Sequence, residues 1–328
     1  MGVLQMKKID TIGVLTSGGD APGMNAAIRA VVRTAKYYGL KVMGVRKGYE
    51  GLVHGDIFEM SARDVSDIMH RGGTILQTAR SLEFKHIEGV RRGISTASYF
   101  GIQAMVVIGG DGSFRGAREL SLEGMPTIGI PGTIDNDISC TEYTIGFDTA
   151  INTAKEAVDR IRDTGSSHER CNIIKVMGRE SGNIALSVGI ATGAEAILIP
   201  EREVDFEKDV LEPINRGKAR NKNHFIIILA EGVNDGDIYE KKIQEATGIE
   251  TRTTTLGYLQ RGGSPTVVDR VVASQMGSRA VELLKDGIGN RVIGMEGNRI
   301  YDIDIVEGLE KPIKVREDLI ELLRILSI

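Results

Sequence analysis

Short apolar runs alternate with helix-like segments along almost the whole chain. IGVLTSGG (12–19) precedes MNAAIRAVVRTAKYYG (24–39), and MVVIGG (105–110) precedes FRGARELSLEG (114–124). Further apolar runs are 41–48, 126–132, 172–178, 196–200 and 225–232. Nearly continuous apolar runs are typical of parallel strands that are buried on both faces. The alternation therefore predicts α/β architecture, with mainly parallel sheets covered by helices on both faces.

The length of 328 residues predicts two domains, because one compact core rarely serves a chain of that size. No linker or low-complexity segment marks a boundary, so the chain is free to cross between domains more than once. Within the alternating pattern, Ser61 and Asp64 have the spacing of a capping box. That spacing predicts that a helix begins in SARDVSDIMH (61–70).

The composition excludes several classes of protein. Hydrophobic residues are 41% and charged residues 26%, as in ordinary soluble proteins, and the net charge of −4 argues against a nucleic-acid partner. No apolar run is long enough to span a membrane, and the segment MGVLQMKKID lacks a signal core. We therefore expect a soluble cytoplasmic protein whose two cysteines, Cys140 and Cys171, are buried and reduced.

Glycine is over-represented, at 41 of 328 residues, and it gathers where the predicted strands end. These ends read SGGD, IGGDGS, PGTIDND, VMGRESG and AEG. Ligands of open α/β sheets bind beyond the carboxyl ends of the strands, where helix N-termini favour phosphate. One such junction suits a tight turn, but five together favour a phosphate-bearing ligand.

The standard phosphate-binding motifs are absent from these junctions. Gly18 and Gly23 have P-loop spacing, but Met24 and Asn25 replace the required Lys and Ser/Thr. GDGSFRG is not GxGxxG, because its last glycine falls one residue late. The sequence therefore supports neither a P-loop NTPase nor a dinucleotide-binding fold.

Three aspartates stand out at the strand ends: Asp111, Asp135 and Asp137. Mg²⁺ prefers one or two carboxylates together with phosphate oxygens, and phosphoryl transfer needs a group that accepts the proton of the attacking hydroxyl. Asx-type turns and helix caps use the same residues. A turn, a metal site and a catalytic base therefore all remain open for PGTIDND.

Four arginines lie beside glycine or in loop-like positions: Arg170, Arg179, Arg252 and Arg261. A guanidinium grips phosphate with two parallel hydrogen bonds and keeps its charge. Most arginines in proteins are solvated surface residues. The interpretation of these four as phosphate ligands therefore rests on the residues that flank them.

The segments TSGGDAPGMNAAIR, IGGDGS, PGTIDND, VMGR, ETR and QRGGSP stand in the order and spacing of the bacterial-type ATP-dependent phosphofructokinases. The chain resembles that family from about residue 7 to about residue 300. The resemblance implies two three-layer α/β domains, with the chain crossing between them, in a homotetramer. It places a larger ATP-binding domain at 1–145 plus about 260–308. A smaller sugar-phosphate domain takes about 146–259 plus 309–328.

The resemblance implies transfer of the γ-phosphoryl group of MgATP to the 1-hydroxyl of fructose 6-phosphate, the committing step of glycolysis. The positions that match ATP contacts are Gly19, Arg80, Ser81, Gly110, Asp111, Gly112 and Ser113, with Asp111 also as the Mg²⁺ residue. Asp135 matches the proton acceptor, and Thr133 and Arg179 complete the catalytic set. Asp137 is expected to serve the outer shell of the metal or to orient its neighbours.

Further positions match the sugar-phosphate site, and two of them, Arg170 and Arg252, match a pair that reaches the phosphate from a neighbouring subunit. The whole set is Thr133, Ile134, Asp135, Arg170, Met177, Gly178, Arg179, Glu231, Arg252, Tyr258, Leu259, Gln260 and Arg261. Gly112 and Gly132 match the ATP-using branch of the family, where the pyrophosphate-using branch has Asp and Lys. Larger side chains there are expected to fill the space of the α-phosphate.

An effector site for ADP as activator and phosphoenolpyruvate as inhibitor is also implied. Arg29 and Arg33 stand four apart on one predicted helix, so they share a face and an anion between them would relieve their repulsion. The remaining matching positions are Arg162, Gly193, Ala194, Glu195, Arg220, Lys222, Asn223 and His224. The segment 220–224 is equally consistent with a solvated turn.

Three positions depart from the family pattern. Tyr258 stands where many relatives have His, and a phenol brings no positive charge to the sugar phosphate. Ala62 stands where some relatives have an effector-site Arg, and Arg220 replaces a Lys. These departures bear on the KM for sugar phosphate and on the strength of regulation.

Two other functions compete with an ATP-dependent kinase. A pyrophosphate-dependent enzyme would be expected to lack Gly112 and Gly132. A non-catalytic nucleotide-sensing subunit would be expected to have lost an acidic or arginine site residue, and none is missing.

Overall fold

The computed structural model describes residues 9–233, 236–312 and 316–326, so the N-terminal residues 1–8 lie outside it. The chain forms two compact units. The larger unit consists of Met1–Ile134, Ile138–Asp148 and Arg261–Ile313. The smaller unit consists of Asp135–Asp137, Thr149–Gln260 and Lys314–Ile328, so the chain crosses between the units several times.

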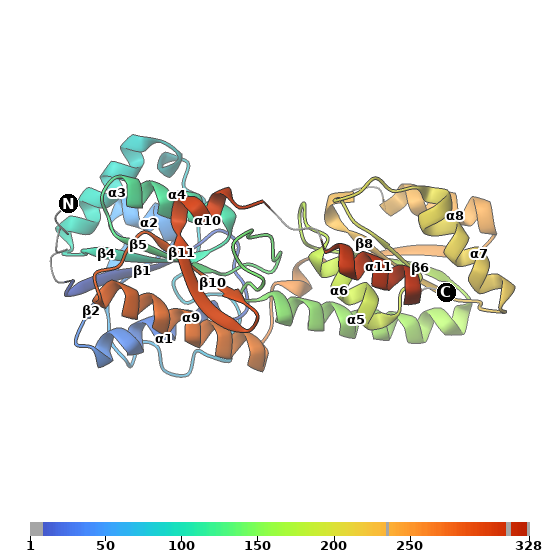
Figure 1. Ribbon diagram of the computed structural model, residues 1–328. Coiled ribbons are helices and arrows are strands. Elements are labelled where there is room, and N and C mark those ends of the chain that lie inside the picture. The colour runs from blue at the N-terminus through green and yellow to red at the C-terminus, as the bar shows by residue number, and fades with distance from the viewer. Residues whose placement is uncertain (1–8, 234–235, 313–315, 327–328) are drawn as a thin grey trace. The chain divides into compact units, whose positions relative to one another are not determined.

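The larger unit is built on a seven-stranded sheet in the order β11-β10-β5-β4-β1-β2-β3 (Figure 1). Its inner strands run parallel, whereas β3 pairs antiparallel with β2 and β11 pairs antiparallel with β10. The strands are β1 (Thr11–Ser17), β2 (Lys41–Val45), β3 (Ile57–Met60), β4 (Ala104–Gly109), β5 (Thr127–Pro131), β10 (Arg291–Glu296) and β11 (Arg299–Asp304).

Helices cover both faces of this sheet, as expected from the buried, apolar strands. The paired helices α1 and α9 lie on one face, and α2, α3, α4 and α10 lie on the other (Figure 1). The helices are α1 (Met24–Tyr37), α2 (Gly48–His54), α3 (Ile87–Tyr99), α4 (Asp111–Leu122), α9 (Val267–Lys285) and α10 (Ile305–Glu310), with a 3₁₀ turn at Glu83–Lys85. This arrangement confirms the predicted three-layer α/β architecture.

The smaller unit has a parallel four-stranded sheet in the order β7-β8-β6-β9. Helices α5 and α6 cover one face and α7 and α8 the other, and α11 packs on α6 (Figure 1). The strands are β6 (Cys171–Val176), β7 (Ala196–Leu198), β8 (Phe225–Ala230) and β9 (Thr251–Thr255). The helices are α5 (Phe147–His168), which begins in the larger unit, α6 (Asn183–Thr192), α7 (Glu212–Ala219), α8 (Gly236–Thr247) and α11 (Glu317–Leu326), with a π-helical turn at Glu207–Leu211 and 3₁₀ turns at Glu231–Val233 and Gly257–Gln260.

The parallel register brings the glycine-rich strand ends of the larger unit together. Ser17 stands opposite Gly109, and Gly109 stands opposite Pro131. The segments that follow β1, β4 and β5 therefore leave the sheet side by side. This is the edge at which an open α/β sheet binds its ligand.

The predicted helix at 61–70 is wrong, because the segment consists of turns. The capping contact itself forms, since the backbone N and the hydroxyl of Ser61 each donate to Asp64 Oδ2 at 2.7 Å. Asp67 then takes a left-handed φ of 52°, which a helix cannot continue. Val65 and Ile68 are buried, so packing of these two side chains fixes the turns.

Both cysteines are buried and free of disulfides, as predicted. Cys140 belongs to the core of the larger unit and Cys171 to that of the smaller one. Across the described ranges, no helix is both long and apolar enough to cross a membrane.

Candidate active site

Three strand-end loops of the larger unit pack closely because glycine leaves them room. A Cβ on Gly109 would lie 2.4 Å from Ser113 Oγ and 2.5 Å from the carbonyl oxygen of Ser17. A Cβ on Gly110 would lie 3.5 Å from the side chain of Thr133. The loops after β1, β4 and β5, which contain most of the predicted ATP residues, therefore form one surface lined largely by backbone.

Helix α4 starts at the centre of this surface. Its N-cap, Gly110, has no side chain to accept from the first N–H groups, and the N–H of Ser113 donates to the Gly110 carbonyl at 3.0 Å. The N–H groups of Asp111 and Gly112 and the positive end of the helix dipole are therefore the groups that an anion would meet. A Cβ on Gly112 would meet nothing within 4 Å. This end of α4 is therefore suited to an approaching phosphate.

Gly132 differs from Gly112 in its surroundings. A Cβ on Gly132 would meet Ile108 Cγ2 at 3.1 Å and Met24 Cε at 3.3 Å, within the packed interior. At Gly112 a side chain would extend into open space, in line with the prediction that it would fill the space of the ligand. At Gly132 a side chain would first have to displace Ile108 and Met24.

Asp111 is the first residue of α4, and its carboxylate pairs with Arg115 one turn later at 2.9 Å. This hydrogen bond and the negative charge of Asp111 raise the pKa of Arg115. Within the described ranges, no group of three or more His, Cys, Asp or Glu side chains is placed to hold a metal ion. One carboxylate fits the usual protein contribution to Mg²⁺ that is carried by phosphate oxygens.

One further predicted residue, Arg261, lies against the loop after β1. The Arg261 guanidinium packs against Gly19 so closely that a Cβ there would lie 1.9 Å from Nη2. Arg80 is exposed in the segment before the 3₁₀ turn, and Ser81 Oγ accepts a 3.4 Å hydrogen bond from the N–H of Phe84.

In the smaller unit, a buried carboxylate and an exposed guanidinium meet at the predicted catalytic position. The side chain of Asp135 is 7% exposed and that of Arg179 is 63% exposed, and 3.4 Å separates Asp135 Oδ2 from Arg179 Nε. Asn136 follows with a left-handed φ of 49°, and its carbonyl accepts a 2.8 Å hydrogen bond from Asn183 Nδ2. The segment 135–137 is thereby held against the start of α6.

The loop that carries Arg179 has an unusual backbone. Gly178 has φ 136° and Arg179 has φ 51°, and a Cβ on Gly178 would lie 2.4 Å from the carbonyl oxygen of Ser181. The N–H of Arg179 donates to Glu231 Oε2 at 3.2 Å. The structure therefore brings together Asp135, Gly178, Arg179 and Glu231, and the left-handed φ of Arg179 is the kind of strain found at functional sites.

Gln260 links two further segments of the predicted sugar-phosphate site. It is fully buried, its Oε1 accepts from the N–H of Met177 at 3.3 Å, and its Nε2 donates to the carbonyl of Gly257 at 3.2 Å. The adjoining side chains of Tyr258 and Leu259 are 78% and 69% exposed. Gln260 thus holds the backbone from the interior, while the preceding residues Tyr258 and Leu259 are exposed.

Arg170 and Arg252 are joined by a residue to which the sequence analysis gave no role. Glu250 accepts from Arg170 Nε at 2.9 Å and from Arg252 Nη2 at 2.7 Å. These hydrogen bonds lower the pKa of Glu250. Its place two residues before Arg252, directly before a strand in which alternate side chains share a face, was the available signal.

Part of the predicted effector set forms a cluster in the smaller unit. Lys222 pairs with Glu195, whose Oε2 also accepts from the N–H of Ile226 at 2.7 Å, and Arg162 donates to the carbonyl of Thr192. Gly193 ends α6 with φ 61°, and a Cβ there would meet nothing within 4 Å. Ala194 is buried, while Arg220 and Asn223 are exposed and His224 is half-buried.

Arg29 and Arg33 lie on α1 of the larger unit, four residues apart as predicted. Burial and the nearby charge of Arg33 lower the pKa of Arg29. The predicted residues thus fall into a nucleotide group in the larger unit and a sugar-phosphate group mostly in the smaller one, with effector positions in both. Thr133, Ile134 and Arg261 are the sugar-site positions that belong to the larger unit.

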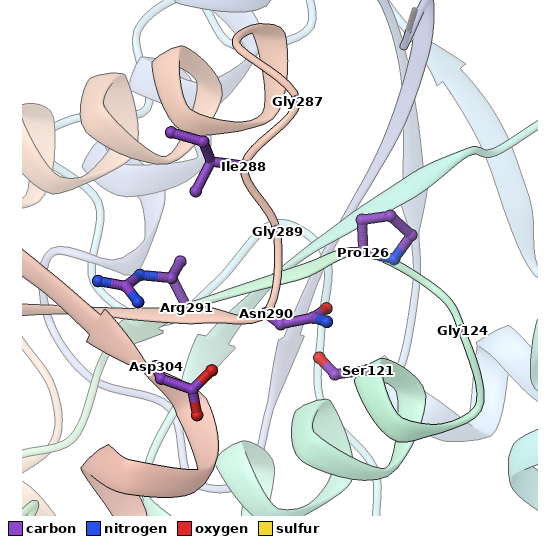
Figure 2. Close-up of a pocket in the computed structure, with 9 residues that line it drawn as sticks. All are labelled: Ser121, Gly124, Pro126, Gly287, Ile288, Gly289, Asn290, Arg291 and Asp304. Carbon is purple, nitrogen blue, oxygen red and sulfur yellow. The ribbon is translucent and has the colours of Figure 1, made fainter. Parts of the chain in front are cut away.

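A cavity of about 480 Å³ lies at the opposite end of β5 and β10 (Figure 2). In Figure 2 the side chains of Ser121 and Asn290 point toward one another across it, with Asp304 nearby. The lining residues are Ser121, Gly124, Pro126, Gly287, Ile288, Gly289, Asn290, Arg291 and Asp304. None of them is a predicted site residue, so this cavity is separate from the candidate active site.

Comparison with known families decides what the strand-end loops belong to. The family model described as Phosphofructokinase matches residues 11–284, which include both groups of predicted residues. The chain belongs to the phosphofructokinase family. The resemblance inferred from the six sequence segments is thereby confirmed.

Curated relatives extend this likeness over nearly the whole chain. An ATP-dependent 6-phosphofructokinase of Clostridium novyi is 57% identical over 317 residues, covering 97% of this chain and 99% of the relative. One of Alkaliphilus metalliredigens is 54% identical over 318 residues, with the same coverage.

Solved structures share the fold. The phosphofructokinase of Saccharomyces cerevisiae matches with a TM-score of 0.85 and 36% identity, covering 98% of this chain and 47% of the yeast chain. The chain thus spans about half the length of that relative. A pyrophosphate-dependent phosphofructokinase from Marinobacter aquaeolei matches with a TM-score of 0.84 at 22% identity, covering 97% and 92% of the two chains. At that identity the likeness shows the fold alone.

Proposed function

We propose that this chain is an ATP-dependent 6-phosphofructokinase that makes fructose 1,6-bisphosphate and ADP in glycolysis. Full-length relatives at 54–57% identity that bear this name support the substrates. The observation that carries the chemistry is the buried Asp135 carboxylate beside the exposed Arg179 guanidinium. A kinase of this class needs both a proton acceptor and a positive charge for the transferring phosphoryl group.

In the proposed reaction, Asp135 accepts the proton of the sugar's 1-hydroxyl. The oxygen forms a bond to the γ-phosphorus as the bond from that phosphorus to the β,γ-bridging oxygen breaks, and ADP leaves with the electron pair. Arg179, drawn from Asp135 toward the phosphoryl oxygens, stabilises their negative charge. Glu231, through the N–H of Arg179, positions this loop.

The nucleotide is proposed to lie along the backbone-lined surface of the larger unit. Gly19 and the backbone of Gly110–Ser113 at the start of α4 are proposed to contact its phosphates, with Arg80 and Ser81 as further contacts. Mg²⁺ would be held by Asp111 together with the phosphate oxygens and would neutralise part of their charge. Asp137 is proposed to orient neighbours of Asp135.

The sugar phosphate is proposed to bind along the smaller unit. Met177, Gly178, Tyr258 and Leu259 are proposed to contact the sugar, with Gln260 holding the backbone of Met177 and Gly257. Thr133, Ile134 and Arg261 of the larger unit are proposed as sugar-site residues from the family pattern. Glu250 already orients Arg170 and Arg252. These two arginines would bind the 6-phosphate of the sugar held in the active site of a neighbouring subunit. This role requires a homotetramer or at least a dimer.

ADP and phosphoenolpyruvate are proposed as effectors at the cationic positions of α1 and of the Glu195–Lys222 cluster. Both ligands carry phosphate, which suits Arg29, Arg33 and the neighbouring Arg162. A cytoplasmic location is proposed as well, since the substrates of glycolysis are found there.

Purified protein given fructose 6-phosphate with either MgATP or Mg-pyrophosphate tests the proposal. We expect bisphosphate with MgATP and little with pyrophosphate, because Gly112 leaves open space beside α4. Product from pyrophosphate would support a pyrophosphate-dependent phosphofructokinase instead. The solved relative of that kind, at 22% identity, shares the fold and supports no more than that. No product from either donor, with nucleotide binding intact, would support a sensing subunit.

A further inference from the structure

The outward face of α4 begins with an ion pair at the proposed metal position. Arg115 Nε lies 2.9 Å from Asp111 Oδ2, and the two side chains are 64% and 46% exposed. Residues four apart share one face of a helix, with about 6 Å of rise between them. Arg115 has no place in the sites described above.

The opposite face of α4 is fixed in the core, so both side chains stay on its outward face and only a change of side-chain rotamer can separate them. Phe114 and Ala117 are fully buried, and Tyr49 donates a 2.5 Å hydrogen bond to the carbonyl of Ser113. A Cβ on Gly116 would lie 2.7 Å from the Tyr49 ring. The Asp111 carboxylate can therefore meet a metal only if the Arg115 side chain moves away or shares it.

We propose that Arg115 is a positioning residue that occupies Asp111 in the free enzyme, so that a divalent cation enters with the nucleotide and not alone. This inference rests on the proposed function for the identity of the nucleotide and for Asp111 as the metal residue. An incoming phosphate at the start of α4 offers the guanidinium another partner within one helical turn. The carboxylate then becomes available to the cation that the phosphates carry.

The positive charge of Arg115 sets how much it weakens the binding of a free divalent ion at Asp111. A divalent ion beside Asp111 would stand a few ångströms from a guanidinium and would also have to break its ion pair. At water-like permittivity, the two contributions correspond to roughly a tenfold weaker binding of the free ion. A simple helix-stabilising pair would change the stability of α4 when removed but would not change metal affinity in this direction.

The test measures Mn²⁺ binding to the full chain without nucleotide, by the electron paramagnetic resonance signal of the free ion. Arg115→Gln is compared with the wild type and with Arg91→Gln, which removes an exposed 2.7 Å pair to Glu123 at the other end of α4. We expect about tenfold tighter binding for Arg115→Gln, none of that gain for Arg91→Gln, and wild-type affinity for Arg115→Lys. Asp111→Asn in the Arg115→Gln background is expected to abolish the gain.

Two results would overturn the proposal: no tighter binding by Arg115→Gln, including binding too weak to measure, or an equal gain in both arginine variants. Far-ultraviolet circular dichroism checks that each variant is folded. Because the readout needs no turnover, its failure is separate from failure of the proposed kinase reaction, which the product assay reports.

Discussion

The two units present different kinds of chemical groups at the residues proposed to bind ligands. In the larger unit the strand-end surface is mostly backbone, and glycines at 109, 110 and 112 allow the loops to approach each other or leave space outside. In the smaller unit the corresponding residues are paired charges, Asp135 with Arg179 and Glu250 with two arginines. A backbone surface suits phosphates at a helix N-terminus, whereas paired side chains can exchange partners during a reaction.

This difference predicts that substitutions in the two units fail in different ways. Changes to the glycines of the larger unit are expected to cost stability, or ligand space where the side chain would face outward. Changes to the charged pairs of the smaller unit are expected to leave folding intact and to alter the kinetics.

The largest expected effect is that of Asp135→Ser on kcat. Loss of the proton acceptor should lower kcat roughly 10²–10⁴-fold while nucleotide binding is retained. The measurements are steady-state kinetics and equilibrium binding of a fluorescent ATP analogue. A variant with near-normal kcat would exclude Asp135 as the base.

The next effect concerns stability in the larger unit. Gly109→Ala should lower the free energy of unfolding by about 1–3 kcal/mol, because its Cβ would overlap Ser113 Oγ and the carbonyl oxygen of Ser17. The matched control, Gly112→Ala, should change stability by less than about 1 kcal/mol, because its Cβ meets nothing within 4 Å. Urea unfolding midpoints compare the two, and equal losses would contradict the packing of these loops.

Tyr258→His should have a smaller effect, confined to the sugar phosphate. A partly charged imidazole in place of a phenol is expected to lower KM for fructose 6-phosphate a few-fold with kcat little changed. The comparison should be made at pH 6.5 and pH 8, because the gain requires the protonated ring and should fade at the higher pH. An unchanged or raised KM at pH 6.5 would contradict the expectation.

The prediction with the smallest expected effect concerns the reactivity of Cys140 in the larger unit and of Cys171 in the smaller one. Burial raises the pKa of Cys140, and burial together with Glu195 raises the pKa of Cys171 to about 12, so neither should react with a disulfide reagent at pH 8. With rising urea, Cys171 should become reactive first, because the smaller unit has the smaller sheet. Peptide mapping of the labelled thiols follows both, and earlier labelling of Cys140 would reverse the order of stability.

Strands β1, β4 and β5 of the larger unit could be predicted from sequence, because they are mostly apolar runs that lead into glycine. The strands β3, β9, β10 and β11 were missed, since they are edge strands or mix polar with apolar residues. The helix predicted at 61–70 failed for a related reason. A local capping contact formed, but the burial of Val65 and Ile68 and the left-handed Asp67 overrode it.

The candidate site, too, could be predicted from sequence only in part. Glycines and aspartates at strand ends marked the positions, because their local chemistry is visible in the sequence. Partners distant in sequence were not visible: Arg170 meets Glu250 across 80 residues, and Met177 meets Gln260 across 83. The roles of Glu250 and of the buried Gln260 depend on which strands become neighbours, and the sheet order determines that.

The division of labour between the two units is tested most directly by measuring both KM values in Arg252→Gln. The variant removes one of the two guanidinium groups on Glu250 and leaves the larger unit untouched. The account predicts that KM for fructose 6-phosphate rises about tenfold or more, as for loss of a charge-assisted hydrogen bond, while KM for MgATP stays within about twofold. A rise in KM for MgATP with an unchanged KM for the sugar phosphate would contradict it.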